Sequence, residues 1–174
     1  MSLRHAALLK KAARYVATSA WDSNLLFTKA KGVTIWLNDK PYLDFACGPG
    51  VGNVGYNHSE VLEVVKRVYD HDEAGYGGNF LVNKYQAMLA EQLCQLTPGK
   101  FLKRVFFSKS GGEAVEAAVI ACLKRRPERR GMLSFIGDFH GRLGFSRTAT
   151  TSKSMLIQGL PWGMEKAFFL IFPA

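Results

Sequence analysis

The sequence is poor in the residues that build disulfide frameworks and metal sites. Its three cysteines, Cys47, Cys94 and Cys122, lie far apart in a chain of 174 residues and form no CxxC pair. Its four histidines are equally scattered. An odd number of distant cysteines excludes a disulfide scaffold, and scattered Cys and His residues argue against a zinc site.

Long apolar runs and targeting signals are also lacking. No apolar stretch reaches the length needed to span a bilayer. The N-terminus carries basic residues but no apolar core of a signal peptide. A hydrophobic content of 48% with 21% charged residues is that of an ordinary globular protein. We therefore expect a cytoplasmic protein that does not enter a membrane.

The charge is strongly of one sign, with a formal net charge of +9. Such a charge permits binding to nucleic acid or to other anions. The densest basic run, residues 124–130, is interrupted by Pro127 and has no interleaved aromatic residues. It falls where a helix C-terminus favours cations, which makes a helix end the better interpretation. Nucleic-acid binding stays as an alternative that predicts steeply salt-dependent association.

The stretch 105–118 organises the rest of the chain. Val105 to Phe107 is typical of a buried strand, and strong helix formers follow from Glu113 onward. Between them, residues 108–112 form a polar turn that ends in two glycines. A helix N-terminus with free amides and glycines is suited to holding a phosphate. The spacing Ser110-x-x-Glu113 is also that of a capping box, which occurs on helices that bind nothing.

Periodicity indicates an α/β chain. Two β-α units in succession imply a parallel sheet, with ligands at the carboxyl ends of its strands. The loops 108–112 and 137–142 would both lie there. The expected elements are helices over 3–20, 59–71, 84–96 and 113–125, a β-hairpin over 33–46, a loop over 74–83, and strands over 105–107, 132–136 and 168–172.

Residues 50–55 match a dinucleotide-binding fingerprint in spacing, with glycines at 50, 52 and 55. In such a fingerprint the helix opens within the motif. Here three further residues intervene before Ser59, which has the character of a helix N-cap. A glycine-rich turn is the favoured interpretation, and a dinucleotide-binding domain remains the weaker alternative.

The loop 137–142 contains four side-chain types useful to a binding site. Phe139 can stack on a planar ring, and Arg142 can hold a carboxylate with two hydrogen bonds. His140 adds an imidazole and Gly141 a flexible backbone position. Each residue alone also fits an ordinary core or surface position, so the pairing with loop 108–112 carries the hypothesis.

Three segments, taken together, resemble the class III aminotransferases, the pyridoxal-phosphate enzymes of the ornithine, acetylornithine and 4-aminobutyrate type. The similarity runs from about Gly32 to the end. The segments are Tyr42-Leu43-Asp44-Phe45 with the glycine turn and Asn57-His58, then Phe107 to Ala117, then Phe139-His140-Gly141-Arg142.

The resemblance implies a fold-type-I PLP-transferase-like α/β fold that is incomplete. An N-terminal arm and small-domain hairpin would occupy residues 1–58. The first part of the large parallel-sheet, cofactor-binding domain would occupy 59–174. The family also implies a homodimer, in which the loop near Asn79 and Phe80 reaches the neighbouring subunit's site.

The resemblance further implies a cofactor, substrates and residue roles. Pyridoxal 5'-phosphate would be the cofactor, with an amino acid or ω-amine donor and a 2-oxo acid acceptor as substrates. Phosphate binding is implied for Ser110, Gly111 and Gly112, ring stacking for Phe139, a supporting place beside the ring for His140, and substrate carboxylate binding for Arg142.

Departures from the family pattern concern both the loop and the chain length. Lys109 stands where Asn is common, and Gly112 where Thr, Ser or Ala is common. Class III enzymes are more than twice as long, and their Schiff-base lysine and pyridine-binding aspartate lie beyond the matched region. We therefore expect no catalytic residue in this chain. A catalytically inactive, truncated remnant that dimerises or binds phosphate is the alternative.

Overall fold

The computed structural model describes residues 2–17, 24–73, 81–129, 131–151 and 166–170. The chain forms two compact units, Met1–Asn83 and Lys84–Ala174. The domain boundary at residues 58 and 59, expected from the family resemblance, stays a prediction.

The first unit begins with helix α1, Leu3–Tyr15, which accounts for most of the helix predicted over 3–20. Ser2 caps it, since the Ser2 hydroxyl accepts a hydrogen bond of 3.2 Å from the His5 amide. Leu9, on its apolar stripe, is one of the few buried apolar side chains in the described residues.

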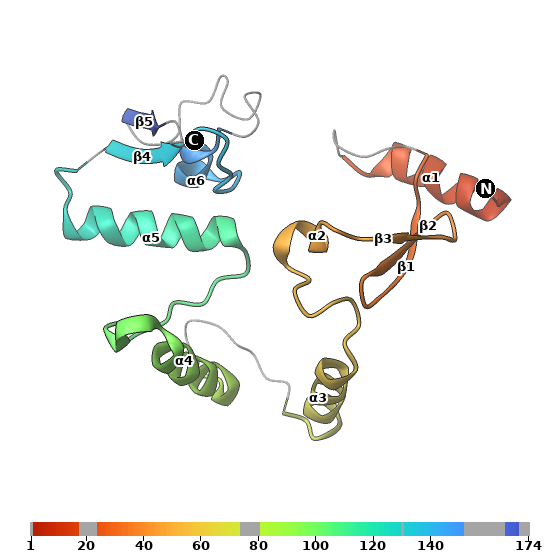
Figure 1. Ribbon diagram of the computed structural model, residues 1–174, viewed down its shortest axis with the longest axis horizontal. Coiled ribbons are helices and arrows are strands. Elements are labelled where there is room, and N and C mark those ends of the chain that lie inside the picture. Colours follow the sequence, from red (N-terminus) through yellow and green to blue (C-terminus); the bar gives the residue numbers. More distant parts are fainter. Residues whose placement is uncertain (1, 18–23, 74–80, 130, 152–165, 171–174) are drawn as a thin grey trace. The chain divides into compact units, whose positions relative to one another are not determined.

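An antiparallel sheet of three strands follows (Figure 1). The predicted hairpin is confirmed as β2, Thr34–Leu37, and β3, Lys40–Leu43. Asn38 and Asp39 turn the chain with φ of 50° and 66°, as a tight two-residue hairpin turn requires. Strand β1, Phe27–Lys31, pairs with β2 and was not predicted.

The glycine-rich segment packs backbone against backbone. It contains the short helix α2, Cys47–Gly50, and then Gly55, whose φ is +83°. A Cβ atom at Gly55 would lie 3.1 Å from the Gly32 carbonyl oxygen, so a side chain would disturb the bridge between Gly32 and Tyr56. The segment is therefore a turn that closes on β1, as favoured from the sequence. Helix α3 begins at Ser59 and ends at Asp70, with His58 rather than Ser59 as its N-cap.

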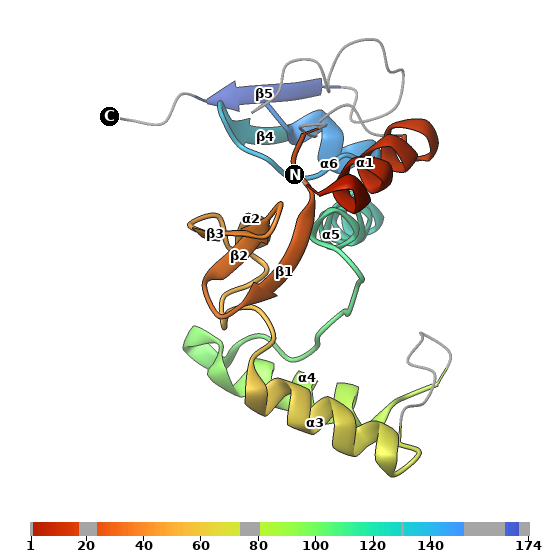
Figure 2. The same ribbon diagram turned by 90° about the vertical axis from the view of Figure 1, so that its right-hand side faces the viewer.

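The described part of the second unit contains two long helices, a short helix, a 3-10 turn and a parallel strand pair (Figures 1 and 2). Strands β4 and β5 pair in parallel register, from Gly131 opposite Lys166 to Phe135 opposite Leu170. The elements in order are α4 (Lys84–Leu96), the 3-10 turn η1 (Pro98–Lys100), α5 (Gly111–Arg125), β4 (Gly131–Phe135), α6 (Gly144–Ala149) and β5 (Lys166–Leu170).

The strand predicted over 105–107 is not formed. Residues 101–108 have no regular secondary structure, and the parallel partner of β4 is β5. A strand needs the backbone of a neighbouring strand for its hydrogen bonds, and neither sheet of the described residues includes this apolar run. The strand predicted over 168–172 is confirmed as far as Leu170, and its last two residues lie outside the described part. Helix α6 was missed because its six residues are too few to show a helical period.

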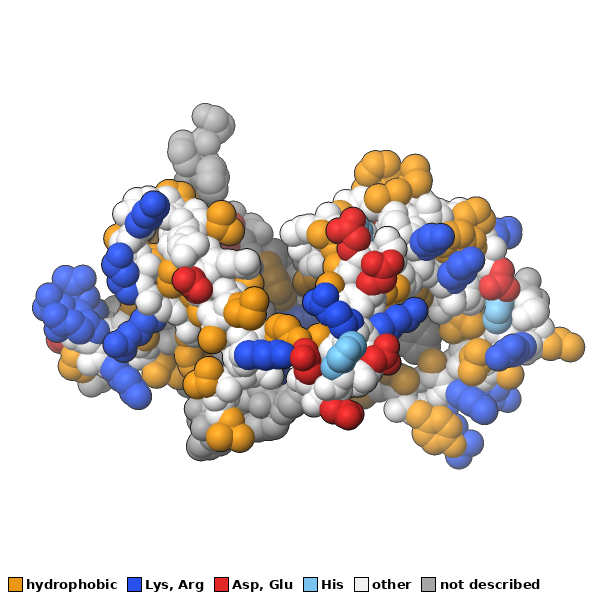
Figure 3. Space-filling model, turned by 90° about the horizontal axis from the view of Figure 1, so that it is seen from below, with side chains coloured by type: hydrophobic (Ala, Val, Ile, Leu, Met, Phe, Trp, Pro, Cys, Tyr) orange, Lys and Arg blue, Asp and Glu red, His pale blue; other side chains and the backbone are white. Residues whose placement is uncertain are grey.

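Burial in the described residues is confined to few positions. Large apolar side chains are exposed on most elements, as Figure 3 shows for one face. In the second unit, by contrast, Ser146 and Thr150 have no exposed surface and Ser134 is 6% exposed. The tightest packing there therefore surrounds α6 and the loop before it.

Candidate cofactor site

The N-terminus of α5 has the geometry predicted for an anion site. Ser110 caps the helix, its hydroxyl accepting from the Glu113 amide at 3.2 Å. The Glu113 carboxylate accepts from the Lys109 amide at 2.8 Å, one residue before the position usual in a capping box. The first-turn amides of Gly111 and Gly112 have no hydrogen-bond partner among the described residues. Two donors at the positive end of a helix are thus left for a ligand.

The two predicted loops meet at glycine. Gly141 has a φ of +133°, and a Cβ atom there would lie 2.9 Å from Gly112 Cα and 2.7 Å from Ser146 Oγ. No real side chain fits such a space. The loop 137–142 is therefore seated directly on the first turn of α5. This contact confirms that the two loops lie together, although strand pairing at 105–107 is not what brings them there.

Hydrogen bonds hold the second loop in place. The buried Thr150 hydroxyl donates to the carbonyl of Gly141 or of Ser146, at 2.9 and 3.0 Å, and accepts from the His140 amide at 3.0 Å. Ser146 accepts from the Leu143 amide at 3.3 Å. These bonds fix the backbone on both sides of Gly141.

Phe139 and Arg142 lie next to each other in this loop. The Phe139 side chain is 54% exposed, and the Arg142 guanidinium lies 5.9 Å from the centre of its ring. A cation over an aromatic face is attracted by the negative face of the ring. A planar ligand would therefore stack on the other face of Phe139 or displace the guanidinium.

His140 faces the acidic residue of the same loop. Its Nε2 atom is buried, has no hydrogen-bond partner among the described residues and lies 3.6 Å from the Asp138 carboxylate. An unpaired buried nitrogen is costly unless a partner is supplied. His140 therefore has a buried ring nitrogen without a hydrogen bond, beside the Asp138 carboxylate, to offer a ligand.

Residues of the first similar segment are tied together in the other unit. The Tyr56 hydroxyl donates to the Asp44 carboxylate at 2.7 Å, and the Ala46 amide donates to the same carboxylate at 2.8 Å. The hydrogen bond from Tyr56, followed by that from Ala46, lowers the pKa of Asp44. The same bond to Asp44 raises the pKa of Tyr56. Their role here is to join the end of β3 to the segment before α3.

Asn79 and Phe80, predicted to reach a neighbouring subunit, lie outside the described residues.

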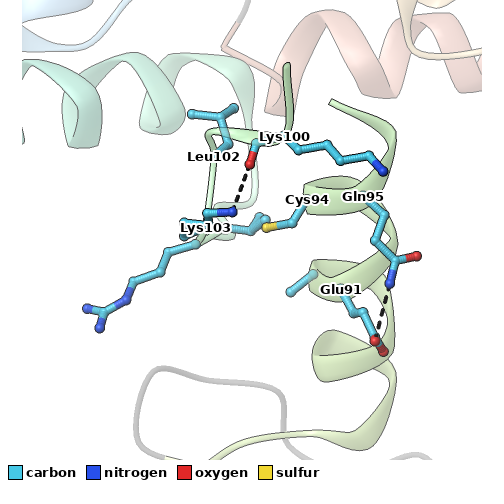
Figure 4. Close-up of a pocket in the computed structure, with 9 residues that line it drawn as sticks. Glu91, Cys94, Gln95, Lys100, Leu102 and Lys103 are labelled. Atoms are coloured by element: carbon cyan, nitrogen blue, oxygen red, sulfur yellow. Dashed lines mark hydrogen bonds between the residues drawn. The ribbon is translucent and has the colours of Figure 1, made fainter. Parts of the chain in front are cut away.

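A separate pocket of about 350 Å³ lies between α4 and the segment after η1 (Figure 4). The Lys103 ammonium group donates to the Lys100 carbonyl at 2.8 Å, and Gln95 donates to Glu91 at 3.3 Å. None of the residues predicted for the cofactor site lines this pocket. Its lining residues are Ala90, Glu91, Cys94, Gln95, Lys100, Leu102, Lys103, Arg104 and Val105.

Comparison with known proteins decides the family. The family model for class-III aminotransferases matches residues 15–172. A probable 4-aminobutyrate aminotransferase of Bacillus subtilis is 35% identical over 127 residues, covering 72% of this chain. An acetylornithine aminotransferase of Haemophilus ducreyi is 31% identical over 147 residues, covering 81%. The chain belongs to the class III aminotransferases.

The fold of this class III chain is also that of known transaminases. An omega transaminase from Pseudomonas jessenii, solved in complex with PMP, matches with a TM-score of 0.79 at 17% identity. The match covers 94% of this chain but only 39% of that one. The chain likewise spans 29% and 36% of the two curated relatives. The structure is therefore part of a fold-type-I transferase fold, as the sequence predicted.

Pyridoxal 5'-phosphate is the cofactor of the class III family, and the residues present fit its phosphate and ring. Gly111 has open space around it, and a Cβ atom at Gly112 would meet nothing closer than 3.8 Å. The missing side chain at Gly112 therefore leaves room above the free amides. The partly exposed Phe139 ring and the unpaired His140 nitrogen lie in the adjoining loop.

Among the described helices, none has the length and apolar character needed to cross a membrane.

Proposed function

We propose that this chain supplies the cofactor-anchoring part of a pyridoxal-phosphate-dependent aminotransferase that acts as a homodimer. The substrates would be an amino acid or ω-amine donor and a 2-oxo acid acceptor, the donor class suggested by the named relatives. The contact of Gly141 with Gly112 carries the proposal, because it joins a phosphate-binding helix end to a loop with an aromatic ring and a guanidinium.

Each residue has a defined task in this proposal. The amides of Gly111 and Gly112 bind the phosphate, and the Ser110 hydroxyl keeps the helix end in the shape that presents them. Phe139 holds the cofactor ring flat, while His140 offers a nitrogen beside it. Arg142 binds the substrate carboxylate, for which it must leave the Phe139 face that it now covers. Bound pyridoxal phosphate supplies the electron sink for reactions at the carbon that bears the amine.

A charge reversal at the helix cap tests the phosphate site. Asp is as good an N-cap as Ser, so Ser110→Asp should leave the thermal unfolding midpoint of the chain nearly unchanged. Its carboxylate, however, would repel the phosphate. We expect the affinity for pyridoxal phosphate to fall by about tenfold or more. An absorbance titration measures this affinity.

Ser2→Asp is the matched control, because it makes the same exchange at the N-cap of α1, where the Ser2 hydroxyl likewise accepts from the amide three residues on. It should leave the affinity for pyridoxal phosphate unchanged. Inorganic phosphate should compete with pyridoxal phosphate in the wild-type chain. If the wild-type chain and Ser110→Asp bound pyridoxal phosphate with equal affinity, the α5 amides would not be the groups that hold the phosphate.

A catalytically inactive remnant that retains phosphate binding is the second candidate. The chain spans 29% and 36% of the two curated relatives, and the family resemblance places the Schiff-base lysine beyond the matched region. Lys109 is a poor substitute because it lies in the phosphate loop itself, away from the far side of a bound ring. An assay of amine-dependent turnover separates the two candidates, because only an active enzyme would show it.

A further inference from the structure

One acidic residue of α5 is hydrogen-bonded to the first turn of α6. Glu116 lies one turn beyond Gly112, and its Oε1 atom accepts from the Ser146 amide at 2.7 Å. The same carboxylate lies close to Gly144, where a Cβ atom would be 3.6 Å from Oε2. This is the short hydrogen bond that joins α5 directly to the segment after the aromatic loop.

Ser146 passes this attachment to the loop. Its side chain is fully buried, its hydroxyl accepts from the Leu143 amide, and its Oγ atom sets the 2.7 Å limit that keeps residue 141 a glycine. Its carbonyl also lies 3.0 Å from the Thr150 hydroxyl, which in turn accepts from the His140 amide. Displacement of Ser146 would therefore move His140, Gly141 and Leu143 together.

We infer that Glu116 is a positioning residue for the cofactor ring. It anchors Ser146 and so holds the loop with Phe139 and His140 at a set distance from the phosphate-binding amides, which lie on the same helix. The phosphate site needs only the first turn of α5. The ring site also needs the loop to keep its position relative to that turn. Loss of Glu116 should thus damage the ring site and spare the phosphate site. This inference rests on the proposed function for its consequence in cofactor binding, but not for its effect on the loop.

The first measurement needs no cofactor. In Glu116→Ala, amide hydrogen exchange at residues 140–146 should speed up by about tenfold or more, because a charged acceptor is removed from the Ser146 amide. Exchange within the central part of α5 should not change. Glu116→Gln keeps an oxygen acceptor and should stay within a few-fold of the wild-type rate. Glu128→Gln, a charge change outside the loop and α5, should have no effect.

The second measurement compares two ligands. In Glu116→Ala, pyridoxal phosphate should bind about tenfold more weakly, whereas inorganic phosphate should bind as it does to the wild-type chain. Unchanged exchange at residues 140–146 would overturn the inference. So would an equal loss of affinity for both ligands, since that would indicate general damage to α5. If the wild-type chain binds no pyridoxal phosphate, the proposed function fails while the exchange data still decide the role of Glu116.

Discussion

At Gly141 the backbone leaves no room for a Cβ atom. The loop approaches α5 so closely that any side chain would collide with Ser146 and with the backbone of Gly112. Gly137, in the same loop, also has a positive φ, +96°, but has open space around it. Substitutions at these two glycines therefore distinguish two effects on the free energy of unfolding, that of backbone strain alone and that of strain combined with a collision.

Gly141→Ala should destabilise the second unit by about 1–3 kcal/mol, since the left-handed backbone and the collision act together. Gly137→Ala should cost clearly less, because only the backbone strain remains. Urea unfolding followed by circular dichroism measures both, and pyridoxal phosphate titration should show weaker binding for Gly141→Ala. Equal destabilisation by the two substitutions would mean that the contact with Gly112 is not tight in solution.

At the scale of elements, short polar links hold neighbouring segments together where apolar packing is sparse. Asn38 ties the hairpin turn to the segment before β1. Its side chain accepts from the Leu26 amide at 3.1 Å and donates to the Asn24 carbonyl at 2.8 Å. The end of β3 is tied to the segment before α3 by the bond between Tyr56 and Asp44. Of these two links, only the bond between Tyr56 and Asp44 joins groups that titrate, so this bond makes stability depend on pH.

The bond between Tyr56 and Asp44 predicts a pH window for the first unit. Because folding lowers the pKa of Asp44, its stabilisation is present above the ordinary value of 3.8 and is lost as the pH falls through the folded-state pKa. Because folding raises the pKa of Tyr56, its stabilisation is present below the ordinary value of 10.0 and is lost as the pH rises through the folded-state pKa.

Tyr56→Phe should lower the thermal midpoint at neutral pH and flatten its fall in acid, while the ring contact with Phe27 is kept. Tyr42→Phe, on β3 and without a recorded hydroxyl partner in the described residues, is the control. If the thermal midpoints of Tyr56→Phe and of the wild-type chain fell equally steeply in acid, the pKa shift of Asp44 would not come from this bond.

At the scale of the whole molecule, the second unit presents apolar surface that its own described residues do not cover. A pocket of about 640 Å³ lies between α5 and β4, where Leu133 is 63% exposed. Helix α4 also carries exposed apolar side chains, among them Met88, Leu89 and Leu96. Parallel sheets are normally covered on both faces, whereas Leu133 of β4 and Leu170 of β5 stay exposed among the described residues.

The family's Schiff-base lysine, expected beyond the matched region, bears on catalysis. We expect the purified chain, supplied with pyridoxal phosphate, a 2-oxo acid and either 4-aminobutyrate or N-acetylornithine, to show no amine-dependent turnover. A full-length relative such as the acetylornithine aminotransferase of Bacillus subtilis, assayed alongside, provides the positive control. Turnover by the chain, together with a borohydride-reduced adduct on one specific lysine, would show that a local lysine performs the missing step.

Much of this protein follows from local sequence alone. The helix after Ser110, the hairpin around Asn38 and Asp39, and the parallel strand 132–136 were predictable, because capping residues, turn residues and apolar periodicity act over a few positions. The motifs in loops 108–112 and 137–142 also identify the family and the expected cofactor without any coordinates.

Tertiary structure decided the rest. The apolar run 105–107 has the composition of a strand, but a strand exists only beside a partner backbone, and periodicity cannot supply one. Nothing in the local sequence distinguishes Glu116 from other helical glutamates. Its carboxylate accepts from the amide of Ser146, which lies 30 residues away in the chain. Gly141 likewise needed the position of Gly112 to explain it. Residue type and spacing are local properties, whereas close approach between distant segments depends on how the whole chain packs.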